Sequence, residues 1–391
     1  MICFNGPRPV KDKKTGELSY SKRAKYGLIS VIIHEVGHNY YPMIVNSDER
    51  QWTWMDEGLN TFLQSIAERA WEEKYPSGRG DPRKIIDYMR SRNQVPIMTN
   101  SESLLQFGPN AYAKPATALT ILRETIMGRE LFDFAFREYA RRWKFKRPTP
   151  ADFFRTMEDA SGVDLDWFWR GWFYTTDAVD ISIDNITEYT ISSKNSETEK
   201  ALKKALADSE PVFLGELRDR TESKRLSRNP ELRDFYNEHD DYTVTNKDRN
   251  KYNETMETLE PWEKLLLANK KHLYLVDFSN LGGLVMPLIL EIELKSGAKT
   301  IERIPAEIWR YSPKKITKLI VTDEPMVGLT QDPYWETADI DISNNSWPRK
   351  LVPSRLELFK TDRERGENLM RDMREPLKDV KKESKVDKKC G

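Results

Sequence analysis

The feature that most constrains this chain is a pair of histidines four positions apart. His34 and His38 belong to the run His-Glu-Val-Gly-His, which follows the apolar segment 28–33. Residues at this spacing lie on one face of an α-helix, about one turn from each other. Two imidazoles and one carboxylate are a ligand set of catalytic zinc sites, in which water takes the fourth position. The apolar segment also indicates that this helix is buried.

Glu57 is the candidate for the third ligand. It falls nineteen positions after His38, within the run Trp-Met-Asp-Glu-Gly-Leu-Asn at residues 54–60. The sequence therefore predicts one Zn²⁺ per chain, bound by His34, His38 and Glu57, with Glu35 beside the metal as a non-ligand. The motif alone also arises by chance, and its other interpretation is a solvated helix surface.

Composition narrows the class of protein. The chain has 391 residues, enough for two or three domains, and 63 basic residues balance 63 acidic ones. This balance argues against a nucleic-acid partner or an anionic membrane surface. Two cysteines, Cys3 and Cys390, do not make a disulfide framework, and neither lies near the histidine pair. The longest apolar stretch, 281–294, is too short and interrupted to span a membrane.

Helical patterns dominate the first half of the chain. The helix with the histidine pair is expected from Ser21 through His38, ended by Pro42, and a second one from Thr53 to about Lys74. Further helices are expected at 81–92, 115–127, 130–143 and 150–160, and the aromatic run 167–173 is typical of a core plug.

The pattern changes to strands at Val179. Strict alternation at 179–184 predicts a half-buried strand. The charged region 195–270 is expected to be partly helical, with one strand-like run at 212–214. Strands are then expected at 273–278, 284–294, 300–309 and 316–322, and short strands with turn signals favour a β-sandwich. A charged, disordered tail is expected from about 356. The fold class is α+β, with domains at 1–178, 179–355 and 356–391.

Together with Tyr112-Ala113-Lys114, these motifs resemble the gluzincin metallopeptidases of the aminopeptidase N family. That family has His-Glu-x-x-His, eighteen intervening residues and a Glu in a Trp-x-x-Glu-Gly setting, then a Tyr-x-Lys motif shortly before a helix. The resemblance covers about residues 1–178, and the β-rich region, including 332–339, is similar to the β-sandwich that follows the catalytic domain.

The resemblance implies a thermolysin-like zinc domain that hydrolyses peptide substrates. Glu35 would be the general base, and the Tyr112 hydroxyl would stabilise the oxyanion. Without the resemblance, Tyr112, one of sixteen tyrosines, is better explained as a core residue beside a helix.

Five other residues are weaker candidates. Asn39 and Asp56 flank the ligands and could orient them, although backbone or surface roles are as well supported. Lys114 could accompany Tyr112, although an exposed lysine is the simpler reading. His239 and His272 lack a ligand spacing; His239 is expected to be a solvated loop residue, and His272, before a strand, a structural one.

The chain departs from the family upstream of the zinc helix. The Gly-x-Met-Glu loop, whose Glu binds the substrate's free amine, is absent, and Met1–Phe4 looks like the strand that follows it. The family's N-terminal domain and sheet lobe are absent too. The chain is therefore expected to be the C-terminal part of a longer protein, with zinc binding but weak or no aminopeptidase activity alone.

The missing upstream part also leaves localisation and substrate specificity open. No signal peptide begins the sequence, which suggests the cytoplasm, but a signal could belong to the missing part, so localisation stays open. Oligomeric state and side-chain preference are not indicated. A gluzincin endopeptidase, and an inactive fragment that acts as a binding module, remain alternatives to an aminopeptidase.

Overall fold

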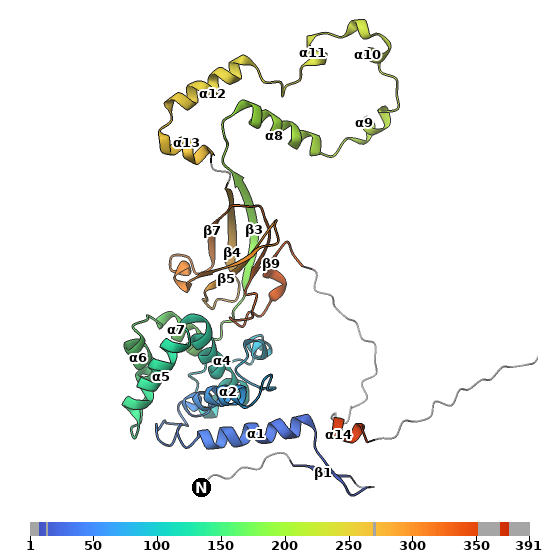
Figure 1. Ribbon diagram of the computed structural model, residues 1–391. Helices are drawn as coiled ribbons and strands as arrows, with labels where there is room; N and C mark the ends of the chain where they lie inside the picture. Colours follow the sequence, from blue (N-terminus) through green and yellow to red (C-terminus); the bar gives the residue numbers. More distant parts are fainter. Residues whose placement is uncertain (1–7, 13–14, 269–270, 351–367, 375–391) are drawn as a thin grey trace, which may run out of the picture.

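The protein is described from a computed structural model, which covers residues 8–12, 15–268, 271–350 and 368–374. The strand expected at Met1–Phe4, both cysteines and most of the expected tail lie outside these residues. Helices and antiparallel strands in the described residues confirm the α+β class, with a helical part followed by sheets and a long insertion (Figure 1). In the described residues, no helix is long and apolar enough to cross a lipid bilayer.

The helical part carries the residues singled out from the sequence. Its α-helices are α1 (Lys22–Gly37), α2 (Leu59–Trp71), α3 (Ile86–Met89), α4 (Lys114–Ile121), α5 (Arg129–Trp143), α6 (Pro150–Ser161) and α7 (Asp166–Tyr174). Three π-helical segments adjoin α2 and α4: η1 (Trp54–Gly58), η4 (Gly108–Ala113) and η5 (Leu122–Ile126). Short 3₁₀ turns are η2 (Pro82–Lys84) and η3 (Ser101–Ser103).

Local signals explain where these helices begin. The Ser21 side chain accepts a hydrogen bond from the Ala24 amide and caps α1. Thr149 and Asp152 form a reciprocal capping box at α6, with Pro150 in the first position. Both helices therefore begin where the sequence predicts. The helix expected at 81–92 is wrong in extent, because only η2 and the four-residue α3 form there.

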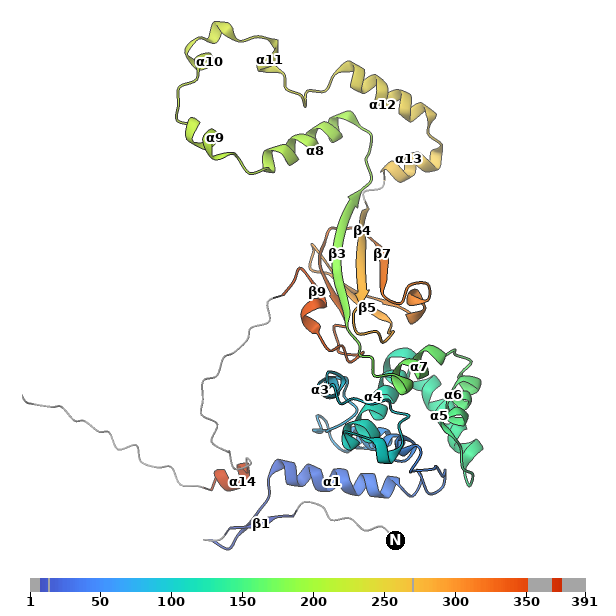
Figure 2. The same cartoon turned by 180° about the vertical axis from the view of Figure 1, so that it is seen from behind.

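The prediction that α1 is buried is wrong. Among its side chains only His34 is buried, while Ile32 is 37% and Val36 is 55% exposed. Figures 1 and 2 show α1 along the outer edge of the helical part, with α2 on its inner side. The apolar residues of α1 face several sides of the helix, and α2 is its main helical neighbour in the described residues.

The strands that follow α7 form two antiparallel sheets. One contains β3 (Ile181–Thr190), β4 (His272–Asn280) and β7 (Lys315–Thr322) in the order β3-β4-β7. The other has the order β6-β5-β8-β9, from β5 (Leu288–Leu294), β6 (Lys299–Ile304), β8 (Met326–Gln331) and β9 (Ser346–Trp347). The Met326 amide donates to the Tyr274 hydroxyl at 2.9 Å, which links the two sheets.

Prolines shorten two of the expected strands. The strand expected at 284–294 begins only at Leu288, directly after Pro287. The one expected at 300–309 ends at Ile304, because Pro305 lacks an amide hydrogen, and the 3₁₀ turn η7 (Ala306–Trp309) follows.

The sheets and the helical part share one hydrophobic core. The expected aromatic plug is confirmed, since Phe168, Trp169, Trp172 and Phe173 of α7 are all buried. The chain then runs from α7 into β3, and Ala178 and Val179 pair with Gly283 and Asp339 of the sheet part. The helical part that carries the candidate site is therefore braced by the sheets.

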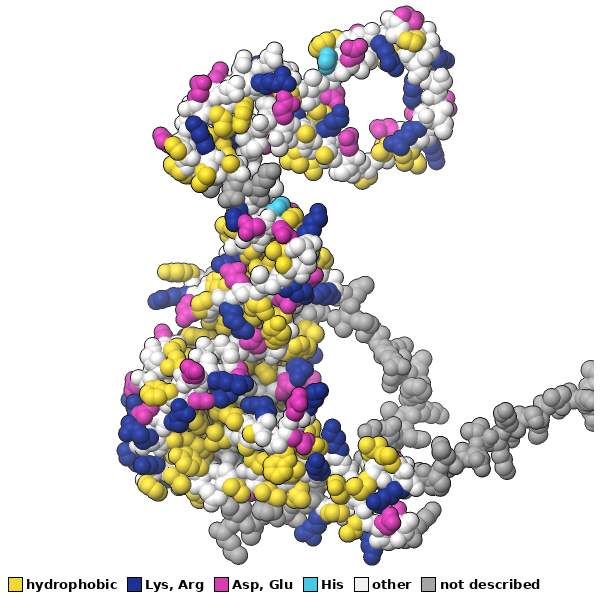
Figure 3. Space-filling view, viewed as in Figure 1, with side chains coloured by type: hydrophobic (Ala, Val, Ile, Leu, Met, Phe, Trp, Pro, Cys, Tyr) yellow, Lys and Arg dark blue, Asp and Glu magenta, His cyan; other side chains and the backbone are white. Residues whose placement is uncertain are grey.

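The charged insertion between β3 and β4 projects from the end of the sheets that is remote from the helical part (Figures 1 and 2). It contains α8 (Ser196–Ser209), α9 (Leu214–Asp219), α10 (Arg225–Arg228), η6 (Pro230–Leu232), α11 (Phe235–Glu238), α12 (Asn246–Thr258) and α13 (Pro261–Ala268). No described side chain from 191 to 268 is buried, and both charge signs are scattered over it (Figure 3). The strand-like run expected at 212–214 is wrong, because these described residues form no strand and α9 begins at Leu214.

The remaining elements lie near the start of α1. They are the hairpin β1 (Val10–Lys11) and β2 (Leu18–Ser19), and α14 (Leu369–Asp372); η8 (Ile342–Asn344) belongs to the sheet part. Asn368 is buried and donates from Nδ2 to the Ser19 hydroxyl at 3.1 Å. The described part of the expected tail thus contacts the hairpin through Asn368.

Candidate active site

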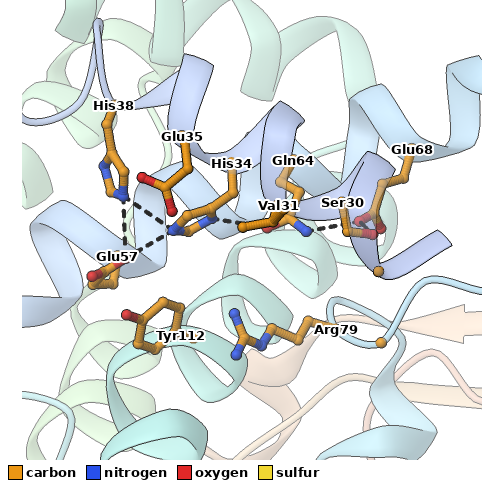
Figure 4. A pocket seen from close by; sticks show the side chains of 12 residues that line it. Ser30, Val31, His34, Glu35, His38, Glu57, Gln64, Glu68, Arg79 and Tyr112 are labelled. Atoms are coloured by element: carbon orange, nitrogen blue, oxygen red, sulfur yellow. Dashed lines mark hydrogen bonds and ion pairs between the residues drawn. The ribbon is translucent and has the colours of Figure 1, made fainter. Parts of the chain in front are cut away.

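Two histidines from α1 and one glutamate from η1 converge on a single point (Figure 4). The nearest Glu57 carboxylate oxygen lies 2.9 Å from His34 Nε2 and 3.4 Å from His38 Nε2, and the two Nε2 atoms are 3.1 Å apart. In a tetrahedral site with zinc–nitrogen bonds of about 2.0 Å, ligand atoms are about 3.3 Å apart. The separations of these three side chains therefore match those of a zinc coordination shell.

Hydrogen bonds on the far side of each imidazole fix which nitrogen carries the proton. His34 Nδ1 lies 2.9 Å from Gln64 Oε1, and the Gln64 amide nitrogen donates to Glu68 at 2.7 Å. His38 Nδ1 lies 2.9 Å from the Tyr41 carbonyl oxygen. Both Nδ1 atoms must therefore be donors.

In the neutral imidazoles both Nε2 atoms then present lone pairs. These lone pairs face each other and the Glu57 carboxylate, with no donor between them. Three acceptors at such short separations repel one another unless a proton or a cation lies among them. The donor set therefore fits a divalent metal of the zinc type.

The charge state of the metal-free site agrees with this interpretation. Burial lowers the pKa of His38, but its hydrogen bonds to Asp56, Glu57 and the Tyr41 carbonyl outweigh burial and raise it to about 10. Burial raises the pKa of Glu57, but hydrogen bonds from His34, His38 and Tyr112 lower it to about 2. A protonated His38 thus occupies the metal-free site, and a metal would displace that proton.

Two further side chains surround the convergence point without joining it. Glu35 is half-buried, lines the pocket and has no hydrogen-bond partner among the described residues. Tyr112 lies in η4, and its ring stacks on His34 with centroids 5.7 Å apart. Burial and the Glu57 carboxylate raise the pKa of the Tyr112 phenol, which stays protonated and able to donate a hydrogen bond. The structure thus places all five predicted residues at one pocket of about 480 Å³.

A glycine allows the two segments with Glu57 and Tyr112 to come together. Gly58 directly follows Glu57, and a Cβ atom there would be 2.6 Å from Pro115 and 3.1 Å from the Ala111 carbonyl oxygen. Only glycine therefore fits this contact between η1 and the η4–α4 segment without movement. Both η1 and η4 are π-helical, a geometry that is rare overall and frequent at functional sites.

Of the weaker candidates, Asp56 contacts a predicted ligand, whereas Asn39, His239 and His272 do not. Asp56 is buried, and its carboxylate lies 3.1 Å from His38 Nδ1, so it can orient that ring. Asn39 instead donates to the Val36 carbonyl at the end of α1. His239 packs on Phe235 in the insertion, and His272 bonds Glu188, both far from the pocket.

The prediction that Lys114 is exposed is wrong. Its side chain is fully buried, and its ammonium group donates to Gln94 and to the Thr175 carbonyl, away from the pocket. Burial lowers the pKa of Lys114 to about 7. Lys114 therefore ties α4 to the segment after α7 and does not line the site.

Three of the pocket residues that the sequence did not indicate have polar side chains that bear on the site: Gln64, Glu68 and Arg79. The first two could have been found, because they lie seven and eleven positions after Glu57, on one helix face. Glu68 is 2% exposed and also accepts a hydrogen bond from Ser30 at 2.6 Å. Arg79 lies between two glycines in the loop after α2 and carries no pattern that indicates a site.

The geometry defines a candidate mononuclear metal centre with the Glu35 carboxylate beside it. Residues 15–172 match the family model described as "Peptidase family M1 domain". This part of the chain contains all five predicted residues, and the match agrees with the resemblance to the aminopeptidase N family.

Curated relatives agree with the family match. The chain is similar to the glutamyl aminopeptidase of Bos taurus, 25% identical over 174 residues, with 42% of this chain and 18% of the relative covered. It is also similar to the alanine/arginine aminopeptidase of Saccharomyces cerevisiae, 24% identical over 143 residues, covering 34% and 17%. The chain thus spans less than a fifth of the length of these two relatives.

Solved structures give weaker likenesses. Legionella pneumophila aminopeptidase A in complex with aspartic acid matches with a TM-score of 0.39 and 13% identity, covering 80% of this chain and 25% of that one. A mutant of an M1 zinc metallopeptidase from Deinococcus radiodurans, bound to a Tyr-Ser-Ala substrate, has a TM-score of 0.34 and 17% identity, covering 43% and 37%. The family assignment therefore rests on the sequence matches.

Proposed function

We propose that this chain binds one zinc ion through His34, His38 and Glu57 and hydrolyses peptide bonds, by removing amino acids from the N-terminus of peptides. The observation that carries the proposal is the convergence of three lone pairs on one point, with the unpartnered Glu35 carboxylate beside it. The names of the relatives, which are aminopeptidases, support the exopeptidase mode.

Each site residue has a defined task in this proposal. Zinc bound there would supply Lewis acidity, which polarises a carbonyl group and acidifies water. Glu35 accepts the proton of the attacking water and delivers it to the leaving amine. The Tyr112 hydroxyl donates a hydrogen bond to the carbonyl oxygen as negative charge develops on it, which is worth about 3 kcal/mol.

Residues behind the site hold these groups in place. Gln64 and the Tyr41 carbonyl keep both imidazoles in the tautomer that binds a metal. The Asn60 side chain donates to the His34 carbonyl at 2.8 Å and ties α1 to α2. The ligands therefore come from two helices whose relative position is fixed by hydrogen bonds.

The domain arrangement is part of the same proposal. Residues 1–178 are a partial thermolysin-like zinc domain, 179–355 a β-sandwich with an insertion near 195–270, and 356–391 a tail. A shared core between the helices and the sheets supports a zinc domain braced by the sandwich.

The test compares the zinc-loaded chain with its Glu35→Gln variant on an alanine anilide. Because the chain is expected to have weak activity alone, the proposal predicts slow hydrolysis by the wild type and its loss in the variant, with zinc content unchanged in both. Zinc loading without turnover would instead favour the inactive binding module. Cleavage of free but not N-acetylated peptides identifies an aminopeptidase, and cleavage of both identifies an endopeptidase.

A further inference from the structure

The pocket contains a guanidinium group that the proposed chemistry does not use. Arg79 lines the pocket opposite α1, and its guanidinium carbon lies 4.3 Å from the centroid of the Tyr112 ring. Figure 4 shows the side chain extending along the pocket floor toward Tyr112. Arg79 therefore lies beside the residue that is proposed to contact the scissile carbonyl.

This guanidinium group has no anionic partner within the described part of the chain. Its nearest carboxylates are otherwise engaged, because Glu57 faces the two histidines and Glu68 accepts from Ser30 and Gln64. Arg79 is half-buried, and the loss of water around it lowers the pKa of its side chain. A desolvated and unpaired charge is unfavourable unless a ligand of opposite charge completes it.

The loop that carries Arg79 is held against the protein. The neighbouring Gly80 has φ +86°, and a Cβ there would lie 3.0 Å from the Ser65 side chain of α2. On the other side of the loop, the Lys84 ammonium group donates to the Ser77 carbonyl. Because both flanks are anchored, the guanidinium group is preorganised in the pocket and loses little freedom when a ligand binds.

We propose that Arg79 binds a carboxylate of the peptide substrate and selects substrates that carry one close to the cleaved bond. The inference rests on the proposed function, in that the ligand is taken to be a peptide. The anions of an unmodified peptide are its C-terminal carboxylate and the side chains of Asp and Glu. Arginine binds either one through two parallel N–H···O bonds.

The geometry limits how far the carboxylate is from the scissile bond. The phenol oxygen lies about 3 Å beyond the ring centroid, so Arg79 is within about 7 Å of the Tyr112 hydroxyl, or about two residue lengths. The favoured substrates are therefore short peptides with a free C-terminus, or peptides with an acidic residue next to the cleaved bond.

Arg79 could instead act only on the Tyr112 ring. A guanidinium over an aromatic face is worth about 0.5–2 kcal/mol and would hold the ring in place. That role predicts equal effects of an Arg79 substitution on charged and uncharged peptides, whereas carboxylate binding predicts a selective loss. The two roles are therefore separated by the choice of peptide.

The experiment measures binding by calorimetry in the zinc-loaded Glu35→Gln background, where peptides are not cleaved. The probes are Ala-Ala-Ala, Ala-Ala-Ala amide, Glu-Ala-Ala amide and Ala-Glu-Ala amide. Arg79→Gln removes the charge, and Arg79→Lys keeps the charge without the planar fork. Arg83→Gln is the matched control, because Arg83 lies in the same loop region but pairs with Asp81 outside the pocket.

We expect at least one carboxylate probe to bind about 10- to 100-fold more tightly than Ala-Ala-Ala amide. Arg79→Gln should abolish this preference, Arg79→Lys should reduce it, and Arg83→Gln should preserve it. Preference for Ala-Ala-Ala shows that Arg79 binds the C-terminal carboxylate of the peptide. Preference for a glutamate probe shows that it binds a side-chain carboxylate.

Two results would overturn the inference: no preference for any carboxylate probe, or an equal loss for all four probes in Arg79→Gln. The proposed function is tested separately by turnover on the anilide, which carries no carboxylate. Turnover without a carboxylate preference would contradict only the proposed role of Arg79. A carboxylate preference without turnover would contradict only the proposed hydrolysis.

Discussion

Gly58→Ala is the most direct perturbation of the contact that assembles the site. An added Cβ would lie 2.6 Å and 2.8 Å from two carbons of Pro115, whereas carbon atoms in contact are about 3.5–4.0 Å apart. The η1 and α4 segments must therefore separate by roughly 1 Å. Overpacking of this kind costs about 1–3 kcal/mol, against a gain of about 1 kcal/mol from replacing glycine in a helix.

Urea unfolding followed by tryptophan fluorescence measures the net effect. We expect Gly58→Ala to lose about 0–2 kcal/mol of unfolding free energy, because the gain from replacing glycine offsets part of the overpacking cost. Gly108→Ala is the control, because no atom lies within 4 Å of a Cβ built there, and it should be neutral or slightly stabilising. Equal stability of the two variants would refute the argument that close packing at Gly58 positions Glu57 beside Tyr112.

Three further predictions separate the roles of the site residues. Gln64→Leu removes the oxygen that accepts from His34 Nδ1, so zinc affinity, measured by chelator competition, should fall about 10- to 100-fold; unchanged affinity would contradict the tautomer argument. Tyr112→Phe should lower kcat about 100- to 1,000-fold with zinc affinity unchanged. If kcat of this variant equals that of the wild type, the Tyr112 hydroxyl does not stabilise the oxyanion. Because zinc must displace a proton from His38, whose pKa is about 10, zinc affinity should rise about tenfold per pH unit from about pH 7 to pH 9. A flat pH profile would show that His38 is already neutral.

The metal-binding geometry was largely predictable from sequence spacing. His34 and His38 share a helix face by periodicity alone, and Glu57 falls where the next helix begins. The starts of α1 and α6 were also predictable from the local sequence, because Ser21 and Thr149 are residue types that cap the N-termini of helices.

Tertiary contacts decide what the sequence did not predict. The exposure of Val36 depends on whether a partner covers the outer side of α1, and no periodicity reports that. Lys114 is buried only because Gln94 and the Thr175 carbonyl lie within reach of its ammonium group. Arg79 enters the pocket through the path of a loop, which local propensity does not specify.

X-ray absorption at the zinc edge of the chain loaded with one equivalent of Zn²⁺ tests the central claim most directly. We expect two imidazole nitrogens and carboxylate or water oxygens at about 2.0–2.2 Å, with no sulfur neighbour. In His38→Ala, one imidazole should be lost from the spectrum. A sulfur shell at about 2.3 Å, or a spectrum that the His38→Ala substitution does not change, would contradict zinc binding by His34, His38 and Glu57.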